Sequence, residues 1–265
     1  MTRIFYEERV MSLKSKVRLL ARKFGIEINR YNTSQSTTAR AGVRLESNRV
    51  DCMVDVGAND GGYGRFIRSA GFKGCIISFE PQAEAYKKLI MASHTDPAWH
   101  IAPRMALGDK ASELEINVAG NSTSSSLLHM LPSHIESAPE SICIGKEKVA
   151  VRRLDALNVP AINSAQRIFL KIDTQGYEMP VLLGAKGIMD RVVGVQVEMS
   201  VIPLYAKQVL YQDLLAWLQK ADFQMWGIEP GFMNAKTGQM LQFDGIFFRQ
   251  QHKSKLQNNF VDTSI

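Results

Sequence analysis

The sequence predicts an α/β protein built on a mostly parallel sheet. Short apolar runs alternate with segments of helical periodicity between residues 52 and 220, and such alternation requires crossover connections between parallel strands. The last two apolar runs have no helical pattern between them, which predicts an antiparallel hairpin at the end of the sheet. At 265 residues, the chain is long enough for one large domain with an appendage.

The N-terminal arm carries most of the net charge. Residues 1–30 hold eight basic and three acidic residues, so they account for +5 of the total of +6. Apolar residues recur there at three- and four-residue spacing, which predicts an amphipathic helix with a basic face: Val10, Leu13, Val17, Leu20 and Phe24. Such a helix either attaches to an anionic membrane surface or a partner, or packs on the domain with its charged face in solvent.

A polar stretch at residues 31–40, rich in Ser and Thr, predicts a linker after the arm. We therefore expect an arm and linker over residues 1–47, a main domain over 48–250 and a polar tail over 251–265. Within the main domain the expected strands are 52–56, 75–79, 101–107, 168–172 and 193–197, the expected helices are 63–70, 82–93, 177–189 and 211–220, and the expected hairpin pairs 223–228 with 245–248.

Composition excludes several classes of protein. The three cysteines lack C-x-x-C spacing, and the histidines lack H-x₃-H or H-E-x-x-H spacing, so neither a disulfide framework nor a metal site is expected. There is no apolar run of membrane-spanning length, and the first ten residues are too charged for an export signal. We expect a cytoplasmic protein, with the arm as a candidate peripheral contact to the inner membrane face. The oligomeric state is left open.

The sharpest motif is a strand that ends in an acid and a glycine turn and then enters a helix. Asp55 and Gly57 stand at this turn, and Glu80 follows the next strand 23 residues after Gly57, where a carboxylate can accept hydrogen bonds from both ribose hydroxyls. This pattern predicts a nucleoside-containing cofactor. A dinucleotide fingerprint requires glycine where Asn59 stands, so pyrophosphate is disfavoured. Asp55 suits the ammonium and sulfonium of S-adenosylmethionine.

Four motifs in order resemble the FkbM-type S-adenosylmethionine-dependent methyltransferases, and the resemblance covers residues 48–250. They are Asp55-Val56-Gly57-Ala58-Asn59-Asp60-Gly61, Phe79-Glu80-Pro81, Ala106-Leu107-Gly108-Asp109 and Leu170-Lys171-Ile172-Asp173-Thr174-Gln175-Gly176-Tyr177-Glu178. The resemblance implies a Rossmann-like, seven-stranded class I methyltransferase sheet with an antiparallel last strand. It also implies that Asp109 lies by the adenine and that Asp173 faces the methyl-transfer centre.

We expect the cofactor to contact residues of these motifs and of the polar segment 120–126, which is either a lid or a plain solvent loop. The expected cofactor-binding residues are Asp55, Gly57, Ala58, Asn59, Tyr63, Glu80, Pro81, Gly108, Asp109, Ser125 and Asp173.

Methyl transfer to a hydroxyl requires alignment and removal of a proton. The candidate catalytic residues are Asp173, Glu178 and Glu198. Glu178 can instead be a carboxylate at a helix start, and Glu198 a buried strand acid satisfied by its neighbours. His129 and His134 lie in a segment that could approach the site, although each is expected to be a surface or loop histidine rather than a metal ligand.

The leading hypothesis is an O-methyltransferase that acts on a hydroxyl of a sugar, a glycan or a small-molecule natural product. A cell-envelope glycan is preferred, because the arm could hold the enzyme near a membrane where lipid-linked sugars are assembled. The alternatives are a noncatalytic S-adenosylmethionine-binding protein and, less favoured, an NAD-binding oxidoreductase. A nucleic-acid substrate is not expected, since the main domain is nearly neutral and lacks a D-P-P-Y-type motif. Acceptor identity would depend on residues 119–145, 200–210 and 229–242.

Overall fold

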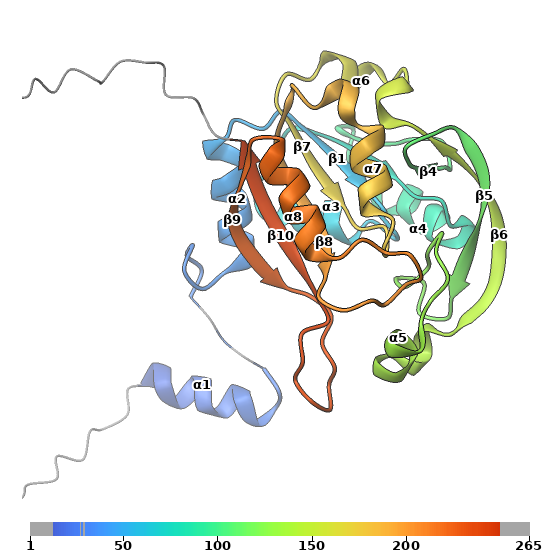
Figure 1. The fold of residues 1–265 in the computed structure, drawn as a ribbon. Coiled ribbons are helices and arrows are strands. Elements are labelled where there is room, and N and C mark those ends of the chain that lie inside the picture. Colours follow the sequence, from blue (N-terminus) through green and yellow to red (C-terminus); the bar gives the residue numbers. More distant parts are fainter. Residues whose placement is uncertain (1–12, 27, 29, 250–265) are drawn as a thin grey trace, which may run out of the picture.

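A seven-stranded sheet forms the centre of the computed structural model, which describes residues 13–26, 28 and 30–249 (Figure 1). The strand order is β3-β2-β1-β7-β8-β10-β9. The five strands from β3 to β8 in this order run parallel, and β10 runs antiparallel to both of its neighbours. The arrangement confirms the predicted fold class. The antiparallel strand lies one position inside the sheet, however, because β9 and not β10 forms the edge.

The strands of this sheet are β1 (Cys52–Val56), β2 (Cys75–Phe79), β3 (Trp99–Ile101), β7 (Ile168–Ile172), β8 (Val192–Ser200), β9 (Phe223–Pro230) and β10 (Gln242–Arg249). The α-helices are α1 (Leu13–Lys23), α2 (Thr37–Ser47), α3 (Gly62–Ser69), α4 (Ala83–Ser93), α5 (Pro132–Ser137), α6 (Pro160–Ser164), α7 (Glu178–Gly184) and α8 (Tyr211–Lys220). Three short 3₁₀ helices are η1 (Pro139–Ser141), η2 (Leu154–Ala156) and η3 (Lys186–Ile188).

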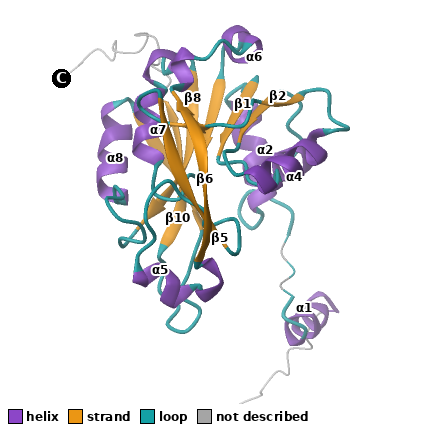
Figure 2. Cartoon of the chain, turned by 90° about the vertical axis from the view of Figure 1, so that its right-hand side faces the viewer, coloured by secondary structure: helices purple, strands orange, loops and turns teal. Residues whose placement is uncertain are grey.

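A second sheet, which the sequence analysis missed, has the order β4-β6-β5. Its strands are β4 (Ala106–Leu107), β5 (Ser112–Ala119) and β6 (Cys143–Arg152). In Figure 2 it lies in front of the main sheet. It contributes Ala106, Leu107 and Ile116 to the wall of a cavity that opens at the carboxyl ends of the parallel strands.

Helices cover both faces of the main sheet, and each face has its own core. On one face, Leu45 of α2, Ile67 of α3 and Leu89 of α4 pack together with side chains of the sheet. On the other face, Val181 of α7 and Leu214 of α8 belong to the larger core. Strands β1 and β7 are buried throughout, which explains why they read as continuous apolar runs.

The expected strands at 52–56, 75–79 and 168–172 and the expected helix at 211–220 match the structure residue for residue. The single strand expected at 101–107 is wrong. Pro103 interrupts it, because proline has no N–H to donate to a strand ladder. The segment therefore divides into the end of β3 and β4, which belong to different sheets. The helix expected at 177–189 is also shorter, since α7 ends at Gly184 and η3 follows.

The expected linker at residues 31–40 is wrong in its second half, because α2 begins at Thr37. The Ser36 hydroxyl caps this helix by accepting a hydrogen bond from the Ala39 N–H at 3.2 Å. A Ser- and Thr-rich segment thus contains a helix start as well as a loop. We place the beginning of the folded domain at α2 rather than at residue 48.

Glu229, near the carboxyl end of β9, fixes α2 to the sheet. Its carboxylate accepts hydrogen bonds from Arg40 at 2.6 and 2.9 Å, from Arg44 at 3.1 Å and from the Thr37 hydroxyl at 3.1 Å. Because β9 runs parallel to β8 across β10, the first turn of α2 lies at the edge where the parallel strands end.

The basic arm forms a helix, α1, as expected, although Val10 lies outside the described residues. In both ribbon views α1 lies apart from the body of the protein (Figures 1 and 2). The tail expected at 251–265 also falls outside the described residues. Within the described chain, no helix has the length and apolar character needed to cross a membrane.

Replacing Glu229 with Ala should destabilise the protein by about 1–3 kcal/mol, because it leaves two partly buried guanidinium groups without their carboxylate. Urea denaturation followed by circular dichroism measures the change. Glu84→Ala removes an exposed ion pair to Lys87 and should leave the stability nearly unchanged, because solvent screens this pair. Equal effects of the two substitutions would show that Glu229 does not fix α2.

Candidate active site

A cavity of about 580 Å³ opens at the carboxyl ends of the parallel strands. It lies where the strand order changes direction, between β1, which leads to β2 and β3 on one side, and β7, which leads to β8 on the other. Ligands of open α/β sheets bind at such a switch point. The volume is in the range of small-molecule sites. Of the expected site residues, the cavity wall includes Gly57, Ala58, Asn59, Tyr63, Glu80, Pro81, Ser125, Asp173 and Glu198.

The turn after β1 requires glycine at its first position. Gly57 has φ +78°, and a Cβ atom built there would lie 1.8 Å from the carbonyl oxygen of Asp173. The backbones that follow β1 and β7 therefore approach as closely as a glycine allows. Asn59 and Gly61 also have positive φ, and Gly61 is the N-cap of α3. This geometry turns the chain back into α3 and leaves Gly57, Ala58 and Asn59 at the cavity wall.

Glu80 closes the opposite side of this cradle. Its Oε2 accepts a hydrogen bond from the Asn59 N–H at 2.7 Å, and its Oε1 accepts one from the Gln82 N–H at 2.8 Å. The side chain is 6% exposed. Burial raises the pKa of Glu80 to about 7, although the two backbone donors oppose the shift. Each oxygen of the carboxylate keeps a lone pair for a ligand.

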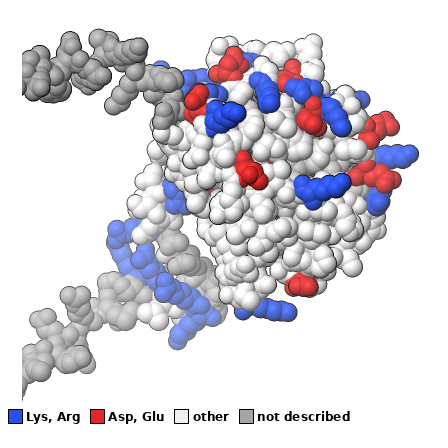
Figure 3. Space-filling view, viewed as in Figure 1, with Lys and Arg blue, Asp and Glu red and all other residues white. Residues whose placement is uncertain are grey.

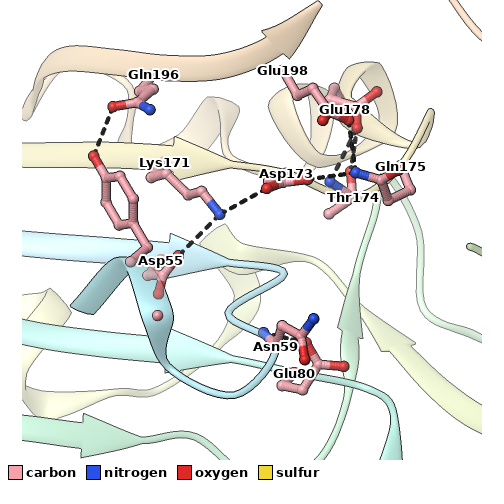
Figure 4. Close-up of polar contacts among 12 residues, drawn as sticks. Asp55, Asn59, Glu80, Lys171, Asp173, Thr174, Gln175, Glu178, Gln196 and Glu198 are labelled. Atoms are coloured by element: carbon pink, nitrogen blue, oxygen red, sulfur yellow. Dashed lines mark hydrogen bonds and ion pairs between the residues drawn. The ribbon is translucent and has the colours of Figure 1, made fainter. Parts of the chain in front are cut away.

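Lys171 of β7 stands between two carboxylates (Figure 4). Its Nζ lies 3.5 Å from Oδ1 of the fully buried Asp55 and 3.3 Å from Oδ2 of Asp173. Its Nζ also lies 5.1 Å from the centroid of the Tyr63 ring. Burial alone would lower the pKa of Lys171, but the carboxylates of Asp173 and Asp55 outweigh burial and raise it. The ammonium therefore stays charged and links Asp55 of β1 to Asp173. We call the part of the cavity around Asp173 and Glu198 the transfer end.

Asp55 does not belong to the cavity wall formed by the described residues. Its carboxylate contacts Lys171 and accepts a hydrogen bond from the Ser78 hydroxyl at 3.3 Å. Burial raises the pKa of Asp55, and Lys171 opposes that shift. The expected direct contact of Asp55 with a cationic ligand is therefore not supported, because Lys171 occupies that side of the carboxylate.

Gln175 connects the carboxylates of the transfer end. Its Nε2 donates to Oδ1 of Asp173 and to Oε2 of Glu198, both at 2.8 Å, and its Oε1 accepts from the hydroxyl of Tyr205 at 2.8 Å. Gln242 donates a further hydrogen bond to Oε2 of Glu198 at 2.7 Å. The left-handed backbone of Gln175, with φ +54°, turns this side chain into the site.

Glu198 faces the cavity as a carboxylate of raised pKa. Burial is the first cause that raises its pKa well above the ordinary value, and the nearby charges of Asp173, Glu178 and Asp244 raise it further. Asp244 of β10 also lines the cavity, and burial followed by the charge of Asp173 raises its pKa to about 6. Neighbouring carboxylates thus make one another more basic.

The far wall comes from residues 121–127, which form a loop as expected and line the cavity. The Ser125 hydroxyl accepts a hydrogen bond from Gln82 Nε2 at 3.2 Å.

The expectation that His134 lies on the surface or in a loop is wrong. It lies in α5, is 2% exposed and lines the cavity, with Nε2 3.2 Å from the Ser124 hydroxyl. Burial lowers its pKa to about 4, so the ring is neutral. His129 is exposed, as expected.

Besides Asp55, three expected site residues lie outside the cavity wall formed by the described chain: Gly108, Asp109 and Glu178. Gly184 lets α7 approach the backbone of Gly108, since a Cβ on Gly184 would lie 2.0 Å from the Gly108 carbonyl oxygen. The Asp109 carbonyl accepts a hydrogen bond from Arg153 at 2.6 Å. Glu178 is buried, and its Oε1 accepts from the N–H groups of Thr174 and Gly176 at 3.0 and 2.9 Å. The alternative of a helix-start carboxylate therefore describes Glu178.

Sequence reasoning missed Lys171, Gln175, Gln242 and Asp244 as site residues. Lys171 carried a signal, because a lysine inside an apolar strand is rarely buried without an acidic partner. The other three belong to a turn and to the hairpin, where polar residues are ordinary. Among the described residues, no group of three or more His, Cys, Asp or Glu side chains could hold a metal ion.

Comparison with models of known protein families gives a match that covers well over half of the chain. The model of the Methyltransferase FkbM domain matches residues 55–225. No curated protein sequence matches.

Several solved structures are similar to this chain at low sequence identity. A methyltransferase FkbM from Methylobacillus flagellatus is 16% identical, with a TM-score of 0.46 over 74% of this chain and 43% of that one. An rRNA methylase from Streptococcus thermophilus is 10% identical, with a TM-score of 0.44 over 85% of this chain and 100% of that one. A SAM-dependent methyltransferase from Aquifex aeolicus is 11% identical, with a TM-score of 0.39 over 79% and 89% of the two chains. This chain thus spans less than half the length of the Methylobacillus protein.

The geometry around Glu178 predicts a structural role. Glu178→Ala should lower the free energy of unfolding by about 2–4 kcal/mol, because it leaves buried N–H groups without an acceptor. Glu178→Gln retains the oxygen that accepts these hydrogen bonds and should cost less than half as much. Thermal and urea unfolding measure both variants. A Glu178→Ala protein of unchanged stability would contradict this role and return the residue to the catalytic candidates.

Proposed function

The chain belongs to the methyltransferase FkbM family, and from this premise we propose that it methylates a hydroxyl group of a sugar, a glycan or a similar polyhydroxylated molecule. Membership of this family favours a methyltransferase that uses S-adenosylmethionine over the two other hypotheses, an NAD-binding oxidoreductase and a noncatalytic binding protein. The nature of the acceptor is the part that we propose.

The cavity fits S-adenosylmethionine on grounds of its own shape and donor set. The glycine turn at Gly57 brings backbone close to a ligand without the clash that a Cβ would cause. The Glu80 carboxylate lines the same cavity with free acceptor capacity for a ribose diol. We propose that Gly57, Asn59, Glu80 and Ser125 hold the cofactor. When bound, it supplies an electrophilic methyl group.

The single observation that supports a polyhydroxylated acceptor is the composition of the transfer end. Carboxylates and amides gather there on one side, with Asp173, Glu198, Asp244 and Gln242 all at the cavity wall. Planar groups that accept and donate in several directions suit the hydroxyl groups of a sugar. Phe232 lines the same cavity and offers an apolar ring surface.

We propose distinct roles for the two carboxylates that Gln175 connects. Lys171 neutralises part of the charge of Asp173 at 3.3 Å, which makes Asp173 suited to orient the acceptor hydroxyl. Glu198 accepts hydrogen bonds from the neutral amides of Gln175 and Gln242, and its pKa is raised. A carboxylate with a raised pKa is the stronger base, so Glu198 accepts the proton of the hydroxyl. The Gln175 amide fixes the positions of the two carboxylates relative to each other.

Glu80→Ala should weaken S-adenosylmethionine binding about ten- to a hundredfold, because charge-assisted hydrogen bonds to the ribose are lost. Isothermal titration calorimetry measures the affinity, and the exposed Glu113→Ala variant is the control. Thermal unfolding of both variants separates binding from folding, since Glu80 also supports the backbone of Asn59 and Gln82. Unchanged affinity in a folded Glu80→Ala protein would remove Glu80 from the cofactor site.

The proposed base predicts a pH dependence. Glu198 must be ionised to accept a proton, and its pKa is raised, so kcat should increase with pH over a range above that of an ordinary carboxylate. Glu198→Gln should lower kcat about 10²- to 10⁴-fold and abolish this increase.

Asp173→Asn should lower kcat at least about a hundredfold. It should also move the remaining pH increase to lower pH, because the charge of Asp173 raises the pKa of Glu198. Discontinuous methyl-transfer assays at a series of pH values measure both effects. The Asp190→Asn variant, which changes an exposed residue, is the control. A Glu198→Gln enzyme that keeps the pH increase would show that another group is the base.

The acceptor class is tested with isotope-labelled S-adenosylmethionine and a panel of sugars, glycans, phenols and amines, followed by mass spectrometry of the products. Label in ether-linked methyl groups of polyhydroxylated acceptors supports the proposal. Label found only in phenols or amines would contradict it.

A further inference from the structure

Helix α1 presents an apolar surface that no other described part of the chain covers. Leu13 is 78% exposed, Leu20 is 58% exposed and Phe24, just past the helix, is 74% exposed. With Val17, which is 48% exposed, they stand at spacings of three and four residues and share one side of the helix. The expectation of a helix packed on the domain is therefore not met in this structure.

Basic residues project from the other sides of α1, together with Leu19. Lys14, Arg18 and Lys23 belong to the helix, which has no acidic residue in its sequence. Figure 3 shows blue side chains gathered on α1, whereas blue and red alternate over the body of the protein. An amphipathic helix with a basic polar face is the form that binds at the boundary of an anionic bilayer.

The arm leaves the domain at the same edge as the cavity. Glu229 holds Arg40 and Thr37 near the carboxyl end of β9, so the chain runs from the start of α2 toward residue 30 at this edge. Both ribbon views place α1 on this side of the sheet (Figures 1 and 2). Exposed apolar side chains also occur in the loops here. Met233 in the β9–β10 connection is 40% exposed, and Ile142 before β6 is 55% exposed.

We infer that α1 binds the surface of an anionic lipid bilayer and holds the cavity edge of the domain toward that surface. The apolar side of α1 enters the boundary between headgroups and acyl chains, and its basic residues contact anionic headgroups. A single short helix binds modestly, so the association is reversible and depends on salt. Resting on the function proposed above, this inference narrows the acceptor to a hydroxyl of a membrane-associated molecule.

The test uses the full-length protein and sedimentation with vesicles. Vesicles of phosphatidylcholine with phosphatidylglycerol should bind the protein at low salt, and vesicles of phosphatidylcholine alone should bind it at least about tenfold more weakly. Raising the ionic strength from about 0.05 M to about 0.5 M should weaken the binding to anionic vesicles to a similar degree.

Two pairs of variants separate the apolar and basic contributions. Leu20→Ser with Phe24→Ser, and Lys14→Gln with Arg18→Gln, should each reduce binding to anionic vesicles at least about tenfold. The matched controls change exposed side chains of α4 and α8. Ile90→Ser with Met91→Ser, and Lys88→Gln with Lys220→Gln, should leave the binding unchanged.

Calorimetry with S-adenosylmethionine keeps the two proposals distinguishable, because α1 variants should retain the cofactor affinity of the unmodified protein. Absence of binding to anionic vesicles at low salt, or full binding by both α1 variants, would overturn the inference. Sedimentation velocity provides a further check. A dimer that Leu20→Ser with Phe24→Ser abolishes would assign the apolar side of α1 to a second copy of the chain instead.

Discussion

The buried ammonium of Lys171 permits a concentration of carboxylates at the ends of β1, β7, β8 and β10. Asp55 is fully buried, and an isolated buried carboxylate is costly unless a cation or hydrogen bonds compensate it. Lys171 compensates Asp55 at 3.5 Å and Asp173 at 3.3 Å. Because β1 and β7 are also in register, with Asp55 opposite Lys171, the pairing is built into the sheet itself. The position of Asp173 at the cavity therefore depends on a residue that the cofactor need not contact.

The surroundings of Asp173 and Glu198 give these two carboxylates different chemical properties, although both accept a hydrogen bond from the same amide nitrogen. Asp173 has a cation on one oxygen and an amide on the other. Oε2 of Glu198 accepts hydrogen bonds from two amides, and burial, followed by three neighbouring carboxylates, raises the pKa of Glu198. Two acids of similar type thus acquire different roles from their surroundings. Gln175 is the link between them, because one amide nitrogen donates to both and the amide oxygen is held by Tyr205.

The parts of the fold that the sequence predicts well are those whose causes are local. The buried runs of β1, β2 and β7 and the glycine turn at Gly57 can be recognised within ten residues. The second sheet carried a signal that was missed, since Leu114, Ile116 and Val118 alternate with polar residues over β5. In the neighbouring strand β6 the alternation is harder to recognise, because charged residues make up much of the strand. The links made by Gln175, Gln242 and Asp244 could not be predicted, because they depend on which distant turns and strands meet.

The same distinction applies to Glu80 and Glu178. Both are buried acids beside a motif, and burial raises the pKa of each to about 7. Only the structure shows that both oxygens of Glu80 accept backbone donors at the cavity wall, whereas Glu178 turns its Oε1 into the loop that precedes α7. A carboxylate in a motif can thus act on a ligand or on the loop that shapes the site. Asp173 depends on a carboxylate that shapes the loop: Glu178 fixes the turn at Thr174 and Gly176, and from this turn Gln175 donates its hydrogen bond to Asp173.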